Sequence, residues 1–334
     1  MSRGRQLTRW FYAGQIDSLL PALHAFDLVA PGDSVAARWV KEPGGAVPPN
    51  WPEAPATLDG PGGLAKIIAQ AHAMFGRESA RTEDVIYGNN RVAGLTDYFR
   101  IARFTGKQAN SMTLNWTVDR EGRCWGGFLM PTPKIPASKY DGYRSKTRLR
   151  LPFDGEWIVL QGGRKPHEND HLFHEPLRYA CDFVVVRDGV SFSGGGTENS
   201  EHYAFGLPIL APAAGRVLAE VDTFQENTPP HPRPGYMGPG NFVVIDHGNG
   251  ECSILAHLKQ GSVTVARGDS VSSGQKIGEC GNNGFSTEPH LHYQLQISPR
   301  PGGPVVPAAF IDYWADGVPV ARGEPRKGQQ VRAK

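Results

Sequence analysis

Cysteine is scarce in this chain of 334 residues, with four in all, at positions 124, 181, 252 and 280. No two of them are spaced as CxxC, which excludes a zinc ribbon and a thioredoxin-type redox site. Buried free thiols are therefore the simplest expectation. A disulfide between Cys252 and Cys280 is the alternative, if their strands are neighbours.

Long apolar runs and blocks of charge are missing as well. No apolar stretch approaches the length needed to cross a bilayer, so we expect no membrane span. The first residues, MSRGRQLTRWFYAGQ, lack the apolar centre of a secretory signal, so either the protein stays inside the cell or the numbering begins after a removed leader. Lysine and arginine (35) nearly balance aspartate and glutamate (33), and no basic cluster predicts a nucleic-acid partner.

Glycine (41) and proline (28) are abundant, which favours short strands and turns over long helices. The length predicts two domains. Apolar spacing predicts helices over residues 5–25 and 64–76. Four strands should follow, and a turn at 119–122 should join the last two. Their ranges are 84–87, 96–104, 111–118 and 124–130.

Residues 1–132 resemble the NTF2-like superfamily, on the order of helices and strands and on two segments, AGQID at 13–17 and TVDREGRCWGGF at 117–128. The resemblance implies an α+β cone that holds a ligand or pairs two subunits. Self-association through this domain is therefore one expected role. Residues 133–148 are rich in proline and charge and are predicted to be a linker. From residue 149 to 334, short strand-like runs separated by turns predict an all-β domain.

The most informative segment is GNNGFSTEPHLHYQLQIS, at 281–298. Its alternating pattern predicts a strand, so His290 and His292 should project from one face. Imidazole binds zinc and transfers protons near neutral pH, although two incidental surface histidines would give the same pattern. Asp182 lies in the apolar run YACDFVVV, where a carboxylate needs a partner. Further imidazoles precede or follow other strand-like runs, namely His167, His171, His174 and His257.

In this region the sequence resembles the M23 family of zinc metallopeptidases, the lysostaphin-type peptidoglycan endopeptidases. Several ordered segments carry the resemblance: NDH at 169–171, RYACDF at 178–183, PILAPAAGRV at 208–217, GNFVVIDHG at 240–248, AHL at 256–258, GDSV at 268–271, GQKIG at 274–278 and PHLHY at 289–293. The resemblance implies a lysostaphin-type antiparallel sheet or barrel that hydrolyses peptide bonds in peptidoglycan stem peptides or cross-bridges. It also implies that His171, Asp182 and His292 bind Zn²⁺ and that His257 and His290 are catalytic.

Two features depart from the common pattern of that family. Many members place the first histidine four residues before the aspartate, whereas His171 lies eleven before Asp182. His167 and His174 therefore remain alternative ligands. Glu288 stands where a small residue is frequent, and we expect it to be a solvated loop carboxylate rather than part of the substrate groove.

A non-catalytic module of the same fold, which binds the cell wall or regulates another protein, is the alternative function. Degenerate members of the family usually lose ligands, whereas this chain keeps residues of every required type. Hydrolysis of the cell wall requires export, so a periplasmic or secreted location is expected although no leader is visible in this numbering.

Overall fold

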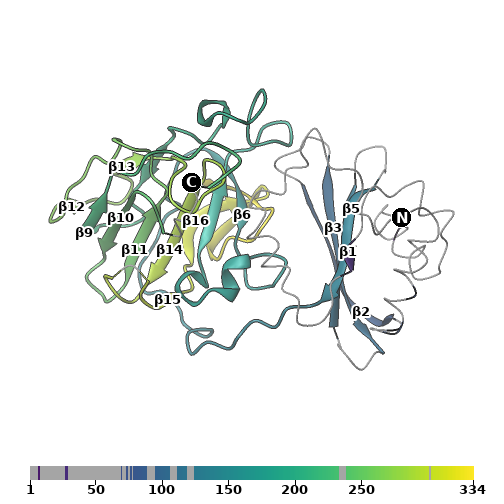
Figure 1. Ribbon diagram of the computed structural model, residues 1–334. Coiled ribbons are helices and arrows are strands. Elements are labelled where there is room, and N and C mark those ends of the chain that lie inside the picture. The colour runs from purple at the N-terminus through teal and green to yellow at the C-terminus, as the bar shows by residue number, and fades with distance from the viewer. Residues whose placement is uncertain are drawn as a thin grey trace. The chain divides into compact units, whose positions relative to one another are not determined.

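The computed structural model contains two compact units, Met1–Pro133 and Lys134–Lys334 (Figure 1). The structure describes residues 7, 27–28, 69, 73, 76, 78–88, 95–105, 111–118, 124–232, 238–300 and 302–334.

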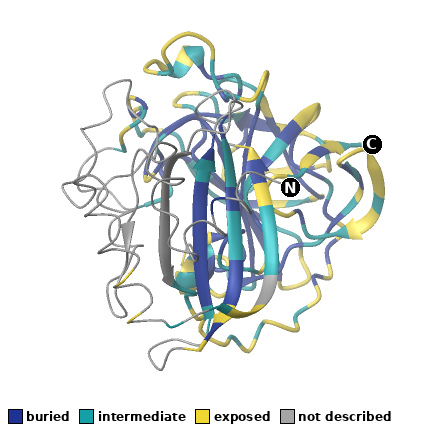
Figure 2. Ribbon diagram, turned by 90° about the vertical axis from the view of Figure 1, so that its right-hand side faces the viewer, coloured by how far each residue is buried: buried dark blue, intermediate teal, exposed yellow. Residues whose placement is uncertain are grey.

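The first unit contains a five-stranded sheet in the order β1-β5-β4-β3-β2. Strands β2 to β5 form an antiparallel meander, and β1 pairs parallel to β5. In β4 the residues from Met112 to Trp116 are all buried, and this strand is the dark central one in Figure 2. The strands are β1 (Asp27–Leu28), β2 (Glu78–Gly88), β3 (Thr96–Phe104), β4 (Ser111–Val118) and β5 (Cys124–Pro131).

All four strands that the sequence predicts for this unit are present. The structure extends the first to Glu78 and the last to Pro131. The predicted helices over 5–25 and 64–76 lie almost entirely outside the described residues, as does the turn at 119–122. The NTF2-like cone therefore stays a prediction.

The second unit is all-β, as the sequence predicts, and is built on an antiparallel sheet of eleven strands. The order is β12-β9-β10-β11-β14-β7-β6-β18-β16-β17, with β15 paired to β14, and a separate small sheet pairs β13 with β8. The strands are β6 (Glu156–Gln161), β7 (Cys181–Val184), β8 (Pro208–Leu210), β9 (Gly215–Val221), β10 (Phe242–Asp246), β11 (Cys252–Ala256), β12 (Ser270–Val271), β13 (Lys276–Glu279), β14 (Leu291–Gln296), β15 (Val305–Val306), β16 (Phe310–Ala315), β17 (Val318–Gly323) and β18 (Gln330–Ala333). Three short 3-10 helices interrupt the loops: η3 (Asp170–Phe173), η4 (Glu175–Leu177) and η5 (Asn199–Glu201).

Alternation along β14 separates the core of this unit from its polar face. Leu291, Tyr293 and Leu295 are wholly buried in the main apolar cluster, together with Phe183 of β7. The residues between them, which include His292, project to the other face of the sheet. All six residues of β14 are buried, so loops must cover that second face.

Residues 134–148, which lie in the segment predicted to be a linker, belong to the second unit, and several of them contact one buried carboxylate. Glu251 is fully buried and accepts hydrogen bonds from the Tyr143 hydroxyl (2.8 Å) and the Lys146 amide (2.7 Å). It also accepts bonds from the amide (2.8 Å) and the hydroxyl (2.6 Å) of Thr147.

Cys181, Cys252 and Cys280 are buried free thiols, which confirms the simpler of the two expectations. A Cys252–Cys280 disulfide is wrong, because Cys252 pairs opposite Gln296 in the sheet and Cys280 forms an isolated bridge with Leu258. In the part of the chain that the structure describes, no helix is both long and apolar enough to traverse a bilayer.

Candidate active site

Three neighbouring strands bring the predicted site residues together. In the register of the sheet, His292 of β14 lies opposite Asp182 of β7 on one side and Ala256 of β11 on the other. Residues that face each other across paired strands project to the same face, so Asp182 and His292 meet there. His257 follows Ala256 directly, and His290 directly precedes β14.

His171 reaches the same point from outside the sheet. It lies in η3, and Asn169 caps this short helix by accepting a hydrogen bond from the His171 amide (3.1 Å). The Asn169 amide group donates to the Ala180 carbonyl (3.0 Å), which fixes η3 to the chain just before β7. The Asn-x-His spacing at 169–171 is thus a helix cap that aims an imidazole at Asp182.

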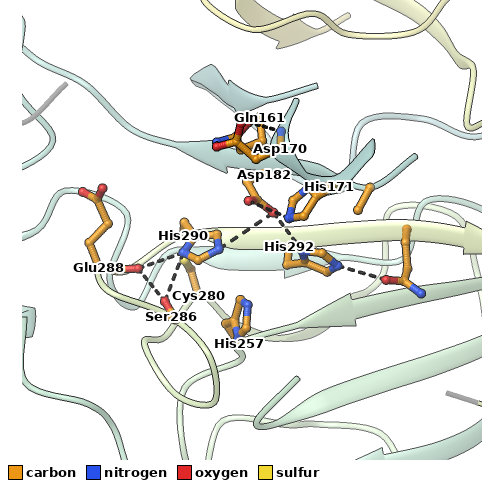
Figure 3. Close-up of polar contacts among 12 residues, drawn as sticks. Gln161, Asp170, His171, Asp182, His257, Cys280, Ser286, Glu288, His290 and His292 are labelled. Carbon is orange, nitrogen blue, oxygen red and sulfur yellow. Dashed lines mark hydrogen bonds and ion pairs between the residues drawn. The ribbon is translucent and has the colours of Figure 1, made fainter. Parts of the chain in front are cut away.

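His171, Asp182 and His292 form a cluster of donor atoms (Figure 3). The Nδ1 atom of His292 lies 2.8 Å from Asp182 Oδ1, and His171 Nε2 lies 3.4 Å from Asp182 Oδ2. One ligand atom from each residue lies within 4.8 Å of the other two. Two imidazoles and one carboxylate are the donor types of a catalytic zinc site, which leaves one coordination position open. The geometry and the donor set therefore fit this metal.

The charges of the cluster are coupled. Burial by itself would raise the pKa of Asp182, but the imidazoles of His171, His290 and His292 outweigh it and hold the pKa below its usual range. Burial lowers the pKa of His171, and only part of that effect is offset by the charge of Asp182. For His292 burial also acts to lower the pKa, yet the charge and hydrogen bond of Asp182 raise it overall. Asp182 is therefore a carboxylate near neutral pH, and His171 is neutral with a lone pair available.

His257 sits beside the cluster in a left-handed backbone conformation, with φ of 62°. This region is uncommon for residues other than glycine and is often found at functional sites. The Nδ1 atom donates to the Asn283 carbonyl (2.7 Å), which leaves Nε2 as the nitrogen with a lone pair. Burial, together with the neighbouring His290 and His292, lowers the pKa of His257 well below its usual value, so the ring is neutral.

The imidazole of His290 is likewise held by a backbone carbonyl. Its Nδ1 atom donates to the Glu288 carbonyl (2.9 Å) and lies 3.1 Å from the Ser286 hydroxyl, which itself donates to that carbonyl (2.9 Å). The Nε2 atom lies 3.8 Å from Asp182 Oδ1. The ring centroids of His257 and His290 are 4.7 Å apart, so the two imidazoles flank one point beside the cluster.

All five residues singled out in the sequence therefore meet in one place. The alternative ligands do not join them: His174 is exposed, His167 is buried, and neither belongs to the cluster of donor atoms. The expectation for Glu288 is wrong, because its side chain is buried with 3% exposure rather than solvated. Its carboxylate contacts Ser191, which lies 97 residues earlier in the chain, so no local pattern reveals its burial.

Sequence reasoning missed the residues that orient the imidazoles. Gln294 accepts a hydrogen bond from His292 Nε2 (3.0 Å), which turns Nδ1 toward Asp182. Its position two residues after His292 on one strand is the signal that could have revealed it. Asn283 and Ser286 lie in the GNNGFS turn, and nothing in their residue types predicts which imidazole they would contact.

Residues 200–305, about a third of the chain, match a family sequence profile. The family is Peptidase family M23. The matched range contains His257, His290 and His292. His171 and Asp182 precede the M23 match, so their place in the site comes from the geometry above.

Two curated relatives are similar to part of this chain. Peptidoglycan DD-endopeptidase ShyA of Vibrio cholerae is 36% identical over 123 residues, which cover 37% of this chain and 24% of that protein. DD-carboxypeptidase/endopeptidase Mpg of Neisseria meningitidis is 44% identical over 103 residues, 30% of this chain and 21% of that protein. The chain thus spans about a quarter or less of the length of these curated relatives.

Among solved structures, the catalytic domain of the antimicrobial peptidase lysostaphin from Staphylococcus simulans is similar to this chain at 24% identity. The similarity covers 35% of this chain and 65% of that one, with a TM-score of 0.24.

Proposed function

We propose that residues 149–334 form a zinc-dependent endopeptidase of family M23 that hydrolyses peptide bonds in bacterial peptidoglycan, in stem peptides or cross-bridges. One observation carries the proposal. The donor atoms of His171, Asp182 and His292 lie within 4.8 Å of one another, beside the rings of His257 and His290.

The proposed division of roles follows from which nitrogen of each imidazole is available. His171, Asp182 and His292 would hold the ion, with Asp182 supplying one negative charge to it. A bound zinc ion supplies Lewis acidity, since it polarises a carbonyl and brings the pKa of water to about 7.

His257 and His290 each donate from Nδ1 to a backbone carbonyl, so in the neutral form of either ring the lone pair is on Nε2. Such a nitrogen can accept the proton of the attacking water. The same nitrogen, once protonated, can donate to the leaving amine or to the oxygen of a tetrahedral intermediate.

The substrate class rests on the comparisons. Both relatives described above carry names of peptidoglycan or DD-bond peptidases, and the matched region of this chain includes three of the five proposed site residues. A peptidoglycan substrate would place the protein in the periplasm or outside the cell. The NTF2-like cone, with self-association through it, remains the proposal for residues 1–132.

The roles can be separated with two variants, assayed for bound zinc and for release of peptides from purified peptidoglycan. We expect His292→Ala to lose zinc and all hydrolysis, because it removes one of three ligands. We expect His290→Ala to keep stoichiometric zinc and to lose at least 100-fold in turnover, the size typical of a lost general acid or base.

His174→Ala is the matched control, because this exposed histidine lies three residues after His171 and outside the donor cluster. It should keep both zinc and turnover. Unchanged hydrolysis in both site variants would disprove the proposal. Stoichiometric zinc in the wild-type protein without hydrolysis of any wall preparation would instead favour the non-catalytic module.

A further inference from the structure

Glu288 lies two residues before His290, and its main chain and side chain face different parts of the protein. Its carbonyl oxygen points at His290 Nδ1 and the Ser286 hydroxyl, whereas its carboxylate extends away from the imidazoles (Figure 3). The side chain is 3% exposed, so its carboxyl group needs hydrogen-bond partners inside the protein.

The carboxylate is held by a buried hydroxyl group from a distant loop. The Ser191 hydroxyl, on a residue with 2% exposure, donates to Oε2 at 2.6 Å. The Nδ1 atom of His202 lies 3.8 Å from the same oxygen, and His202 is 5% exposed. The other ring nitrogen of His202, Nε2, lies 3.2 Å from the Gly196 carbonyl and donates to it, so the imidazole is fixed within its own loop.

Ser191 and His202 are the two ends of one closed loop. The Tyr203 amide donates to the Ser191 carbonyl (3.0 Å), and Phe192 forms a β-bridge with His202. At the tip of the loop, the Glu201 carboxylate accepts hydrogen bonds from the amides of Gly195 (3.2 Å) and Thr197 (2.9 Å). The loop 191–203 is therefore organised by its own contacts and can serve as a fixed support for Glu288.

We propose that Glu288 is the residue that positions His290: its carboxylate fixes segment 286–290 to loop 191–203, and its carbonyl thereby holds the Nδ1–H of the imidazole. The fixed carbonyl selects the tautomer with the lone pair on Nε2, the atom on the side of Asp182. A glycine or alanine at position 288 would keep the carbonyl but lose its attachment to the loop. The catalytic meaning of this arrangement rests on the proposed function, whereas the tautomer itself can be observed without turnover.

The test uses the full chain loaded with zinc, labelled with ¹⁵N-histidine, and compares the wild-type protein with Glu288→Ala and Glu288→Gln. His290→Ala identifies the His290 signals by their loss. The wild-type spectrum should show His290 protonated at Nδ1. In Glu288→Ala this tautomer should give way to a mixture. In Glu288→Gln it should largely persist, because an amide oxygen can still accept from Ser191.

The kinetic readout distinguishes positioning from a merely structural role. In Glu288→Ala we expect kcat to fall about 10- to 100-fold, the range seen when an orienting partner is removed. KM and zinc content should stay at wild-type values, and Glu288→Gln should recover most of the loss. In the His290→Ala background, Glu288→Ala should cause no further loss, since it acts through the missing ring.

Glu175→Gln is the control, because Glu175 is an exposed glutamate outside loop 191–203. It should leave the His290 tautomer and kcat unchanged. If Glu288→Ala does not fold, Ser191→Ala removes the shortest contact to the carboxylate and should shift the tautomer in the same direction.

An unchanged tautomer in folded Glu288→Ala would overturn the positioning role, as would a loss of kcat that only follows a loss of zinc. Full wild-type hydrolysis in His290→Ala would overturn the proposed function instead, and the tautomer measurement would still decide the role of Glu288.

Discussion

Gln294 is the residue on which the orientation of His292 depends. Its amide oxygen accepts from His292 Nε2 at 3.0 Å, while its amide nitrogen donates to the Pro176 carbonyl (3.3 Å) and to Gln296 (3.3 Å). These two hydrogen bonds from the amide nitrogen fix the Gln294 side chain so that its oxygen faces the imidazole. A metal-binding histidine is usually held by such a partner on its other nitrogen.

We expect Gln294→Leu to weaken zinc binding about 10- to 100-fold, because the imidazole loses the acceptor that turns Nδ1 toward Asp182. Gln294→Glu keeps an acceptor and should bind zinc within a few-fold of wild type. Competition with a chromophoric chelator measures both affinities. Equal affinities for the wild-type and leucine proteins would show that Gln294 has no orienting role.

At the level of single residues, the sequence predicts which side chains carry the chemistry of the site. It does not predict which groups orient them. His290, His292 and Asp182 stand out because imidazoles and a carboxylate in apolar strands need a reason to be there. The partners of these imidazoles are an amide and two backbone carbonyls, which occur everywhere in a chain. Only the folded structure shows which of them are used.

Glu226 links the loop before β10 to the turn that holds His257. Its carboxylate accepts from the amides of Gln260 (2.8 Å) and Asn282 and from the Asn283 side chain (3.3 Å). The Asn283 carbonyl in turn accepts from His257 Nδ1. The left-handed backbone of His257 is thus maintained by contacts from both flanking segments.

Glu226→Ala should therefore lower kcat about 10-fold through His257, with zinc content unchanged, since no ligand is touched. Asp222→Asn is a suitable control: Asp222 accepts from the nearby amides of Gly261 (2.8 Å) and Val263 (3.2 Å) and contacts neither Asn282 nor Asn283 through those bonds. Steady-state kinetics on soluble peptidoglycan fragments measure the effect. A larger loss in Asp222→Asn than in Glu226→Ala would contradict this role.

The Glu251 contacts predict a dependence of stability on pH. Burial acts to raise the pKa of Glu251, but hydrogen bonds from Thr147, Lys146 and Tyr143 outweigh it and lower the pKa. A lowered pKa in the folded protein means that the stabilisation is complete above about pH 4.3, the ordinary value of a free glutamate. It is lost as the pH falls from there through the folded-state pKa.

We expect Glu251→Gln to reduce the free energy of unfolding by about 2–3 kcal/mol at pH 7. The reason is that the amide nitrogen of the glutamine would face hydrogen-bond donors that contact a carboxylate oxygen in the wild-type protein. The difference from wild type should shrink when urea unfolding is repeated below pH 4. Glu175→Gln, at an exposed glutamate, should change little at either pH. A difference that grows toward low pH would contradict the sign.

Strands could be predicted from the sequence where the residue pattern that marks them is local. Strands such as β3 and β4 have the bounds that alternation predicts, because each strand shows its two faces in its own sequence. The burial of Glu288 by residues 191 and 202 was not predictable in this way. Contacts between a loop and a distant segment depend on the order of strands in the sheet, which a single sequence does not encode locally.

At the scale of the whole molecule, all the proposed site residues and the main apolar cluster lie within the second unit. We expect a fragment of residues 134–334 to fold, bind zinc and hydrolyse peptidoglycan at a rate near that of the full chain.

A fragment that starts at residue 149, where the sequence places the domain boundary, lacks Tyr143, Lys146 and Thr147. Glu251 would then be left with its four hydrogen-bond donors missing, at a cost of about 3 kcal/mol or more. Urea unfolding of the two fragments at pH 7 measures the difference, and equal midpoints would support the prediction that residues 134–148 are a linker.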